Sequence, residues 1–360
     1  MNDKKRISTL DYLRGLSALG IMIYHCLSWG YGNFSTDSFM GKWGVYGVSM
    51  FYILSGLTLY HVYFNSMIPS LKQVKEFFLK RFFRIFPLLW LTIILTVILS
   101  RSLPPKMSLF YNFTGLFGIF KWDGYIGTGV WSIGNELVFY LFFPVFILLT
   151  KRYKALFYVL SGILACSFLY FAFFKLDINQ SLSNKEQWSM YVNPLNQVFL
   201  FLSGYMMGLY FTKYSFSKTQ TTLIFILATL SFIFYVPMGE NLGGGVNRII
   251  LSILTFMICF SFYKTTLLFP AVLDKIFTVL GEASYSIYLL HPIIWKVLPF
   301  ILKHGFSIKL TTPMQIGLTF IFATAIGYFN YKYFETFFIK FGKKVSSMLD
   351  FKETITVKPG

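Results

Sequence analysis

Three polar side chains interrupt an apolar stretch near the start of the chain, residues 10–29, which is long enough to span a bilayer as a helix. Arg14 and His25 lie eleven residues apart, so at about 100° per residue they face the same side of that helix, and Asp11 lies on the same flank. Charged groups inside a membrane are costly and usually face a protein interior or a wet cavity. We therefore expect this helix to form one wall of an active site, with His25 suited to general-base chemistry.

A basic segment lies at the start of a later apolar run. Basic residues at a helix end commonly anchor to anionic lipid, which suffices to explain Lys80. Arg81 and Arg84, however, are three residues apart on one helical face, and paired guanidinium groups suit a phosphate. We expect these two arginines to bind the phosphate groups of a donor molecule. Glu335, near the end of the last apolar run, is expected only to balance Arg14 or Arg84.

Two further segments carry polar groups within apolar runs. Glu136 lies about two turns inside its run, and a carboxylate at that depth is functional or pairs with a cation. Its expected depth is similar to that of His25, so Glu136 is a third catalytic candidate that orients the imidazole. Segment 281–292 combines serine, tyrosine and His291, and a structural polar seam is at least as compatible with it as a catalytic role.

The composition indicates the class of protein that positions these residues. The chain has 360 residues, of which 56% are hydrophobic and only 13% are charged, about half the charged fraction of a soluble domain. We predict an all-α, polytopic membrane bundle of about ten helices in one domain, residues 1–343, followed by a short polar tail, 344–360. The expected spans are 10–29, 44–64, 86–100, 130–150, 155–174, 194–212, 221–238, a segment that follows the turn at 239–246 and ends near 263, 284–302 and 314–334.

The formal net charge of +18 is distributed unevenly along these spans. If the N-terminus is cytoplasmic, the inner segments hold 20 lysines and arginines and the outer segments hold 9. Cytoplasmic segments of membrane proteins are enriched in lysine and arginine. The asymmetry, together with an even number of spans, predicts that both termini are cytoplasmic.

Several other functions lack their sequence signals. No soluble segment is large enough for a nucleic-acid-binding module, so we expect no nucleic-acid partner. Cys26, Cys166 and Cys259 lie in apolar segments without CxxC or Cys/His spacing, which predicts neither a disulfide framework nor a metal site. No glycine segment has nucleotide-binding spacing. No cleavable signal is expected, and the first helix is predicted to direct its own insertion.

Six motifs follow one another along the chain: LDYLRGLSALGIMIYH at 10–25, GVSMFYILSGL at 47–57, KRFFRIFPLLW at 80–90, WSIGNELVFYLFFPVF at 131–146, LGEASYSIYLLH at 280–291 and YFETFF at 333–338. Each is weak by itself. Together, over nearly the whole chain, they resemble the acyltransferase family 3 of integral membrane proteins. The chain departs from that family's pattern by lacking a proline after Glu335 and by having Asn135 before Glu136.

The resemblance implies a function. The family is similar to acyl-CoA-dependent transferases that move acyl groups, usually acetyl, onto sugar hydroxyls of surface glycans such as lipopolysaccharide O-antigen or exopolysaccharide. It implies a location in the bacterial cytoplasmic membrane, Arg14 and His25 as a functional pair, and Arg81 and Arg84 in the donor site. Acyl-CoA is the expected donor substrate, with no permanently bound cofactor or metal. No appended esterase-like domain is expected here, so transfer would occur within the membrane domain.

The expected reaction begins with acyl-CoA bound from the cytoplasm by Arg81 and Arg84. His25 then acts as a general base on the acceptor hydroxyl, or as a covalent relay for the acyl group, and the spacing does not decide between them. Arg14 holds a polar group of the donor or stabilises the developing oxyanion, and its position well below His25 along the helix favours the donor role. The rival function is a transporter or flippase for a polyprenyl-linked sugar, which would favour internal repeats that we do not find. A purely structural membrane protein leaves the pairing of Arg14 and His25 unexplained, and no feature specifies an oligomeric state.

Overall fold

Helices form all the regular secondary structure in the computed structural model, which describes residues 7–68, 70–176, 184–239, 241–266 and 269–356. The predicted all-α class is confirmed for these residues, which contain no strand. The helices are α1 (Ser8–Tyr31), α2 (Phe39–Tyr63), α3 (Leu71–Ser100), α4 (Lys106–Thr114), α5 (Phe117–Phe120), α6 (Val130–Arg152), α7 (Lys154–Tyr170), the π-helix η1 (Phe171–Lys175), α8 (Asn184–Tyr191), α9 (Pro194–Phe211), α10 (Lys218–Phe234), α11 (Gly245–Lys264), α12 (Ala271–Glu282), α13 (Ser284–Phe306), α14 (Thr312–Phe329), the π-helix η2 (Asn330–Glu335) and α15 (Thr336–Thr356).

Seven helical stretches of the described chain have the length and apolar composition needed to cross a membrane. They are α2, α3, α6, α7 with η1, α11, α13, and the continuous rod α14–η2–α15. All ten predicted spans overlap a helix, but α1, α9 and α10 are not among these seven. The chain is therefore a multi-pass membrane protein that is all-helical over its described residues, and a count of ten crossings depends on these three additional helices.

Helix α3 differs from its predicted boundaries. The expected span starts at residue 86, whereas α3 begins at Leu71 and includes the whole basic segment. The Ser70 side chain caps the helix by accepting a hydrogen bond from the Gln73 amide at 3.4 Å, and Pro87 lies inside the helix without ending it. As a result, Arg81 and Arg84 lie on the same continuous helix as an apolar stretch long enough to cross a membrane.

The connections between the predicted spans are partly helical. Residues 101–129 contain α4 and α5, and α8 and α12 lie in two further connections. Helix α15 continues without a break across the predicted domain boundary between 343 and 344. Parts of some predicted segments lie outside the described residues: the basic start of the chain at 1–6, 177–183, 240, and 357–360.

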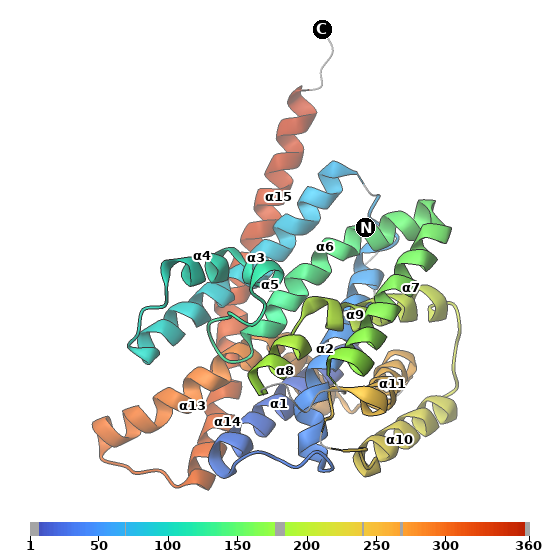
Figure 1. Cartoon of the computed structure of the whole chain (residues 1–360). Coiled ribbons are helices and arrows are strands. Elements are labelled where there is room, and N and C mark those ends of the chain that lie inside the picture. Colours follow the sequence, from blue (N-terminus) through green and yellow to red (C-terminus); the bar gives the residue numbers. More distant parts are fainter. Residues whose placement is uncertain (1–6, 69, 177–183, 240, 267–268, 357–360) are drawn as a thin grey trace.

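Helix α1 packs against α2, α12 and α13. Glycine at position 281 allows α12 to approach α1 closely. A Cβ built on Gly281 would lie 2.1 Å from the Asp11 carbonyl oxygen. Tyr12 of α1 also donates a hydrogen bond to Asp274 of α12. The helix that carries Arg14 and His25 is thus held from several sides (Figure 1).

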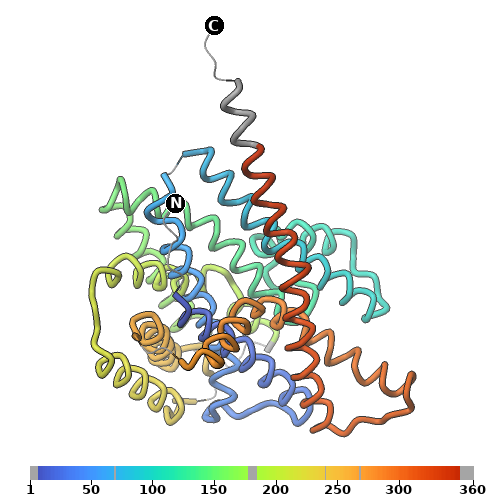
Figure 2. The backbone as a smooth tube through the Cα atoms, turned by 180° about the vertical axis from the view of Figure 1, so that it is seen from behind, coloured from blue at the N-terminus to red at the C-terminus, as the bar shows by residue number. Residues whose placement is uncertain are grey.

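Helices α3 and α15 pack together at one end of the molecule. Figures 1 and 2 show α15 extending beyond the bundle at the same end as the start of α3. The rings of Phe83 and Phe341 lie 5.3 Å apart, and a Cβ on Gly342 would meet the Phe83 Cβ at 2.6 Å. This end corresponds to the predicted cytoplasmic side.

Candidate functional site

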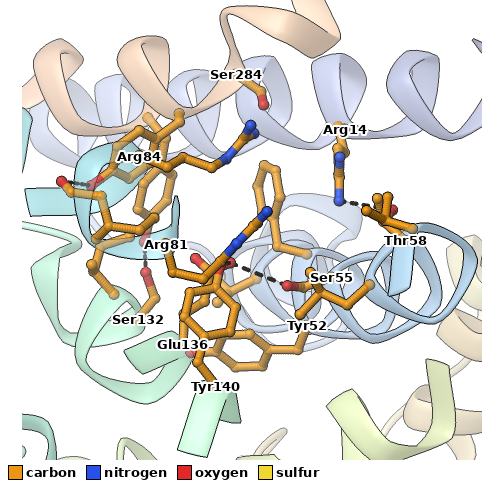
Figure 3. Close-up of a pocket in the computed structure, with 18 residues that line it drawn as sticks. Arg14, Tyr52, Ser55, Thr58, Arg81, Arg84, Ser132, Glu136, Tyr140 and Ser284 are labelled. Atoms are coloured by element: carbon orange, nitrogen blue, oxygen red, sulfur yellow. Dashed lines mark hydrogen bonds between the residues drawn. The ribbon is translucent and has the colours of Figure 1, made fainter. Parts of the chain in front are cut away.

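A cavity lies among α1, α2, α3, α6 and α13, and the space between its walls, including its opening to solvent, is about 990 Å³. Eighteen residues line it (Figure 3): Arg14, Val48, Phe51, Tyr52, Ser55, Thr58, Leu59, Val62, Arg81, Arg84, Ile85, Ser132, Ile133, Glu136, Tyr140, Ser284, Tyr285 and Tyr288. The cavity thus gathers four of the five predicted site residues from three different helices.

Arg14 is anchored to helix α2. One of its terminal nitrogens, Nη2, donates to Thr58 Oγ1 at 2.9 Å and to the Leu54 carbonyl oxygen at 3.3 Å. Its Nη1 lies 3.9 Å from Asp11 Oδ1, one turn back on the same helix. These contacts fix the guanidinium at the wall of the cavity, on the side opposite to α3 (Figure 3).

Arg81 is held among aromatic side chains. Its Nη2 donates to Tyr63 Oη at 3.2 Å, and its guanidinium carbon lies 5.6–5.8 Å from the ring centres of Tyr63, Phe77 and Tyr140. Its buried Nε–H has no hydrogen-bond partner among the residues that the structure describes. The guanidinium is held at the wall of the cavity, and paired N–H donors of this kind suit an anion.

Arg84 lines the same cavity one turn further along α3. Within the described part of the chain it forms neither a hydrogen bond nor an ion pair, and its side chain is half-buried. Its guanidinium points into the space that Arg81 and Arg14 also face (Figure 3). The predicted pairing of Arg81 and Arg84 on one face therefore agrees with their placement, while their binding of a phosphate stays a prediction.

Glu136 is the acidic member of the cavity lining. It accepts hydrogen bonds through Oε1 from Ser55 at 3.1 Å and from Tyr140, one turn further along α6. Three arginines and one glutamate leave the lining with an excess of positive charge. A polar cavity of this kind favours a polyanionic ligand.

The expected contact between Glu136 and His25 is not what the structure shows. Glu136 bonds within the arginine cavity, whereas His25 pairs with His291: His25 Nδ1 lies 2.9 Å from His291 Nε2. Similar depth in the membrane is the basis for expecting Glu136 beside His25. Depth does not specify which helices are neighbours. The catalytic roles predicted for both residues stay predictions.

The two histidines and Trp29 form an aromatic cluster. The rings of His25 and His291 are 5.2 Å apart at 17°, and Trp29 stacks on His25 at 5.1 Å and 13°. Trp29 also contacts Trp295, with ring centres 5.6 Å apart. His25 is half-buried, and His291 is fully buried. Spacing along the chain does not predict that these two histidines pair, because they are 266 residues apart.

Tyr288 lies between the arginine cavity and the histidine pair. It lines the cavity, and its ring centre is 6.2 Å from that of His291, one turn along α13. Its hydroxyl donates to the Gly129 carbonyl oxygen at 3.1 Å and accepts from Ser132 at 3.0 Å. The arrangement places a phenolic ring at the boundary of the two groups of polar side chains.

Glu335 belongs to a separate buried network. It accepts a hydrogen bond from Ser286, whose hydroxyl oxygen accepts another from Asn330 Nδ2 at 2.7 Å. Glu335 and Asn330 both lie in the π-helical segment η2, and such segments are frequent at functional sites. The network connects the end of α14 to α13, next to the wall of the cavity.

Comparison with known proteins gives consistent results. A family model described as an acyltransferase domain matches residues 7–331. Peptidoglycan O-acetyltransferase OatA of Listeria monocytogenes is 26% identical over 369 residues, which cover 89% of this chain and 54% of the relative. A Staphylococcus aureus (strain COL) protein named "Putative O-acetyltransferase" is 26% identical over 380 residues, covering 94% and 58%.

A viral protein extends the range of relatives. The "Putative acetyltransferase" of Acidianus two-tailed virus is 25% identical over 301 residues, covering 79% of this chain and 82% of that protein. The chain spans somewhat more than half the length of the Listeria and Staphylococcus relatives. No solved structure matches the chain.

Proposed function

Because the chain belongs to the acyltransferase family whose model matches residues 7–331, we propose that it is a membrane O-acyltransferase. It moves an acyl group, acetyl in the first instance, from cytoplasmic acyl-CoA to a hydroxyl of a cell-surface glycan or a lipid-linked sugar. The names of its O-acetyltransferase relatives support the acetyl group. The peptidoglycan in the name of the Listeria relative makes a cell-wall glycan the first acceptor to test.

The observation that carries this proposal is the convergence of Arg14, Arg81 and Arg84 on one cavity. Coenzyme A is a polyanion with several phosphate oxygens, and guanidinium groups bind phosphate through paired N–H donors. Arg81 and Arg84 would hold these phosphates, and the cavity would accommodate the pantetheine arm. Arg14 would bind a polar group of that arm, because its bonds to α2 hold it on the opposite side.

The transfer step places His25 at the acceptor hydroxyl. His25 removes the hydroxyl proton as the oxygen attacks the thioester carbonyl carbon; the C–O bond forms, the C–S bond breaks, and the imidazolium returns its proton to the thiolate of coenzyme A. In the covalent alternative, His25 first takes the acyl group itself and then passes it to the acceptor. Incubation with labelled acyl-CoA alone separates the two, because only the covalent route releases one equivalent of free thiol before acceptor is added.

The membrane arrangement that fits this chemistry has ten crossings, with α1, α9 and α10 added to the seven long apolar helices. Both termini would be cytoplasmic, in the bacterial cytoplasmic membrane. The arginine cavity then faces the cytoplasmic donor, and the His25 end of α1 faces the acceptor. This direction agrees with the order of Arg14 and His25 along α1.

The deciding experiment uses the purified full chain in lipid nanodiscs with acetyl-CoA and a soluble glycan fragment. We expect acceptor-dependent release of free thiol and acetylated glycan detected by mass spectrometry. His25→Ala and Arg14→Ala should abolish or strongly reduce this activity at equal protein levels. Full activity in either variant would contradict the assigned mechanism. Transport of a lipid-linked sugar in liposomes without thiol release would instead support the flippase.

A further inference from the structure

We propose that His291 is a positioning residue that fixes the protonation pattern of His25. The inference rests on the proposed function in assigning His25 to the acyl-transfer step. The contact itself is independent of that assignment, since it joins His25 Nδ1 to His291 Nε2 across 2.9 Å between α1 and α13. His291 has none of its surface exposed and is not a member of the cavity lining.

The hydrogen bonds of His291 determine which of its nitrogens carries the proton. His291 Nδ1 lies 3.1 Å from the carbonyl oxygen of Ile287, one turn back on α13. A carbonyl oxygen only accepts, so Nδ1 must be the donor. A fully buried imidazole is expected to be neutral, because an uncompensated buried charge is costly. A neutral ring has one N–H, so His291 Nε2 must carry a lone pair.

The protonation of His25 follows from that of His291. Since His291 Nε2 can only accept in this bond, His25 Nδ1 must donate to it. The neutral His25 ring then has its lone pair on Nε2, which is the atom available to remove a proton from the acceptor hydroxyl. The logic is that of a base oriented by a second group, as in catalytic triads. The second group here is a neutral imidazole held by a backbone carbonyl, not a carboxylate.

Stacking adds a geometric restraint to the bond. The rings of His25 and His291 are nearly parallel, and Trp29 covers His25 at an interplanar angle of 13°. Rotation of the His25 ring would break the in-plane bond to His291 and disturb the stack with Trp29. The pair therefore holds the reactive nitrogen in one orientation, which lowers the entropic cost of reaching the transition state.

Three substitutions of His291 separate the positioning role from a packing role. His291→Gln can place its Oε1 near the position of Nε2, so it keeps an acceptor for His25. His291→Asn is too short to reach His25, and His291→Phe keeps a ring without an acceptor. We expect His291→Phe and His291→Asn to lower kcat by about 100-fold, and His291→Gln to stay within about tenfold of the parent. KM for acyl-CoA should change less than about twofold in all three, because the arginine cavity is unaltered.

A matched control exists on the same helix. His304 Nδ1 contacts the Phe300 carbonyl oxygen at 3.0 Å, one turn back, in the same way that His291 contacts Ile287. It differs in that it is exposed. His304→Gln should leave kcat unchanged, which would separate loss of the local imidazole–carbonyl bond from loss of the contact with His25.

A second readout needs no catalysis. The chain has four histidines, so selective ¹⁵N-histidine labelling gives a spectrum that single substitutions can assign. We expect protonated Nδ1 and unprotonated Nε2 for His25 in the parent chain, retained in His291→Gln and lost in His291→Phe. An unprotonated Nδ1 in the parent would overturn the proposal, as would parental kcat in His291→Phe, or equal loss in a correctly folded His291→Gln. If the parent transfers no acyl group, the proposed function fails, while the spectrum still decides the pairing.

Discussion

At the scale of single residues, Arg81 and Arg84 share a face of α3 but are held differently. Arg81 lies among three aromatic rings and bonds to Tyr63 Oη. Arg84 forms no hydrogen bond or ion pair among the described residues. A preorganised group loses less side-chain entropy when it binds a ligand than a free one does. Arg81 should therefore contribute more to donor affinity than Arg84.

This difference predicts unequal effects of conservative substitutions. Arg81→Lys should raise KM for acyl-CoA by about tenfold, because lysine cannot reproduce the planar, stacked, paired donors. Arg84→Lys should raise it by only about threefold, and kcat at saturating donor should change little in both. Initial rates over a range of acyl-CoA concentrations measure this. Arg152→Lys, at the exposed end of α6, is the control. Unchanged donor affinity in Arg81→Lys would move the donor site elsewhere.

Glu136 is expected to act through the arginine cavity. Glu136→Gln keeps an acceptor for Ser55 and Tyr140 but removes a negative charge from the cavity lining. KM for acyl-CoA should therefore fall by about threefold or more, because the cavity becomes more positive. Isothermal titration with coenzyme A measures the same change directly. A large loss of kcat with unchanged KM would instead place Glu136 in the chemical step, as its sequence position by itself suggested.

At the scale of helices, the site depends on a close contact between α2 and α9. A Cβ on Gly56 would lie 2.0 Å from the Phe201 carbonyl oxygen, and a Cβ on Gly204 would lie 1.9 Å from the Ile53 carbonyl oxygen. Small residues allow such backbone approach between membrane helices. Because α2 also carries Ser55 and Thr58 of the cavity, this contact holds one wall of the site.

The contact predicts a strong effect of one added methyl group. Gly56→Ala or Gly204→Ala should push the helices apart, lower the free energy of unfolding by about 1–3 kcal/mol and reduce activity. Thermal unfolding in detergent, followed by the acyl-transfer assay, measures both. Gly162→Ala in α7 is the matched control, because no atom lies within 4 Å of the added Cβ. Equal stability of Gly204→Ala and Gly162→Ala would contradict the proposed role of the contact.

At the scale of the whole molecule, some of the basic residues counted in the charge asymmetry are buried or line the cavity, so they do not report on the orientation of the chain. Two of the nine lysines and arginines counted in the outer segments are Lys42 and Arg248. Both are fully buried and donate to backbone carbonyl oxygens, so they are not surface charges. Arg81 and Arg84, assigned to inner segments, line the cavity. Removing two residues from each side leaves the inner excess unchanged. The asymmetry therefore still predicts cytoplasmic termini.

The number of crossings determines whether the two termini lie on the same side. An even number, such as ten, puts both on the same side, which the charge asymmetry predicts to be the cytoplasm, whereas seven crossings would put them on opposite sides. We expect reporter fusions at the two ends to report the same cytoplasmic location. A cysteine introduced at Asp37, in the connection between α1 and α2, should react with an impermeant thiol reagent from outside. Opposite locations of the two termini would contradict the ten-span arrangement.

The sequence by itself determined the all-helical membrane class, the family, and which side chains could carry chemistry. Apolar length and helical periodicity are local properties, so Arg81 and Arg84 could be placed on one face, and Arg14 and His25 on another, from their spacing. Some boundaries were less well determined: a serine cap and a tolerated internal proline extend α3 to Leu71.

Only the tertiary structure decided which of these side chains meet. The bond between His25 and His291 joins positions 266 residues apart, and the bond between Ser55 and Glu136 joins positions 81 apart. Spacing along one helix fixes direction and depth, but the neighbour on another helix depends on how all the helices pack. For this reason, depth by itself predicts that Glu136 orients the His25 imidazole. Packing instead gives His25 a histidine partner and places Glu136 among the arginines.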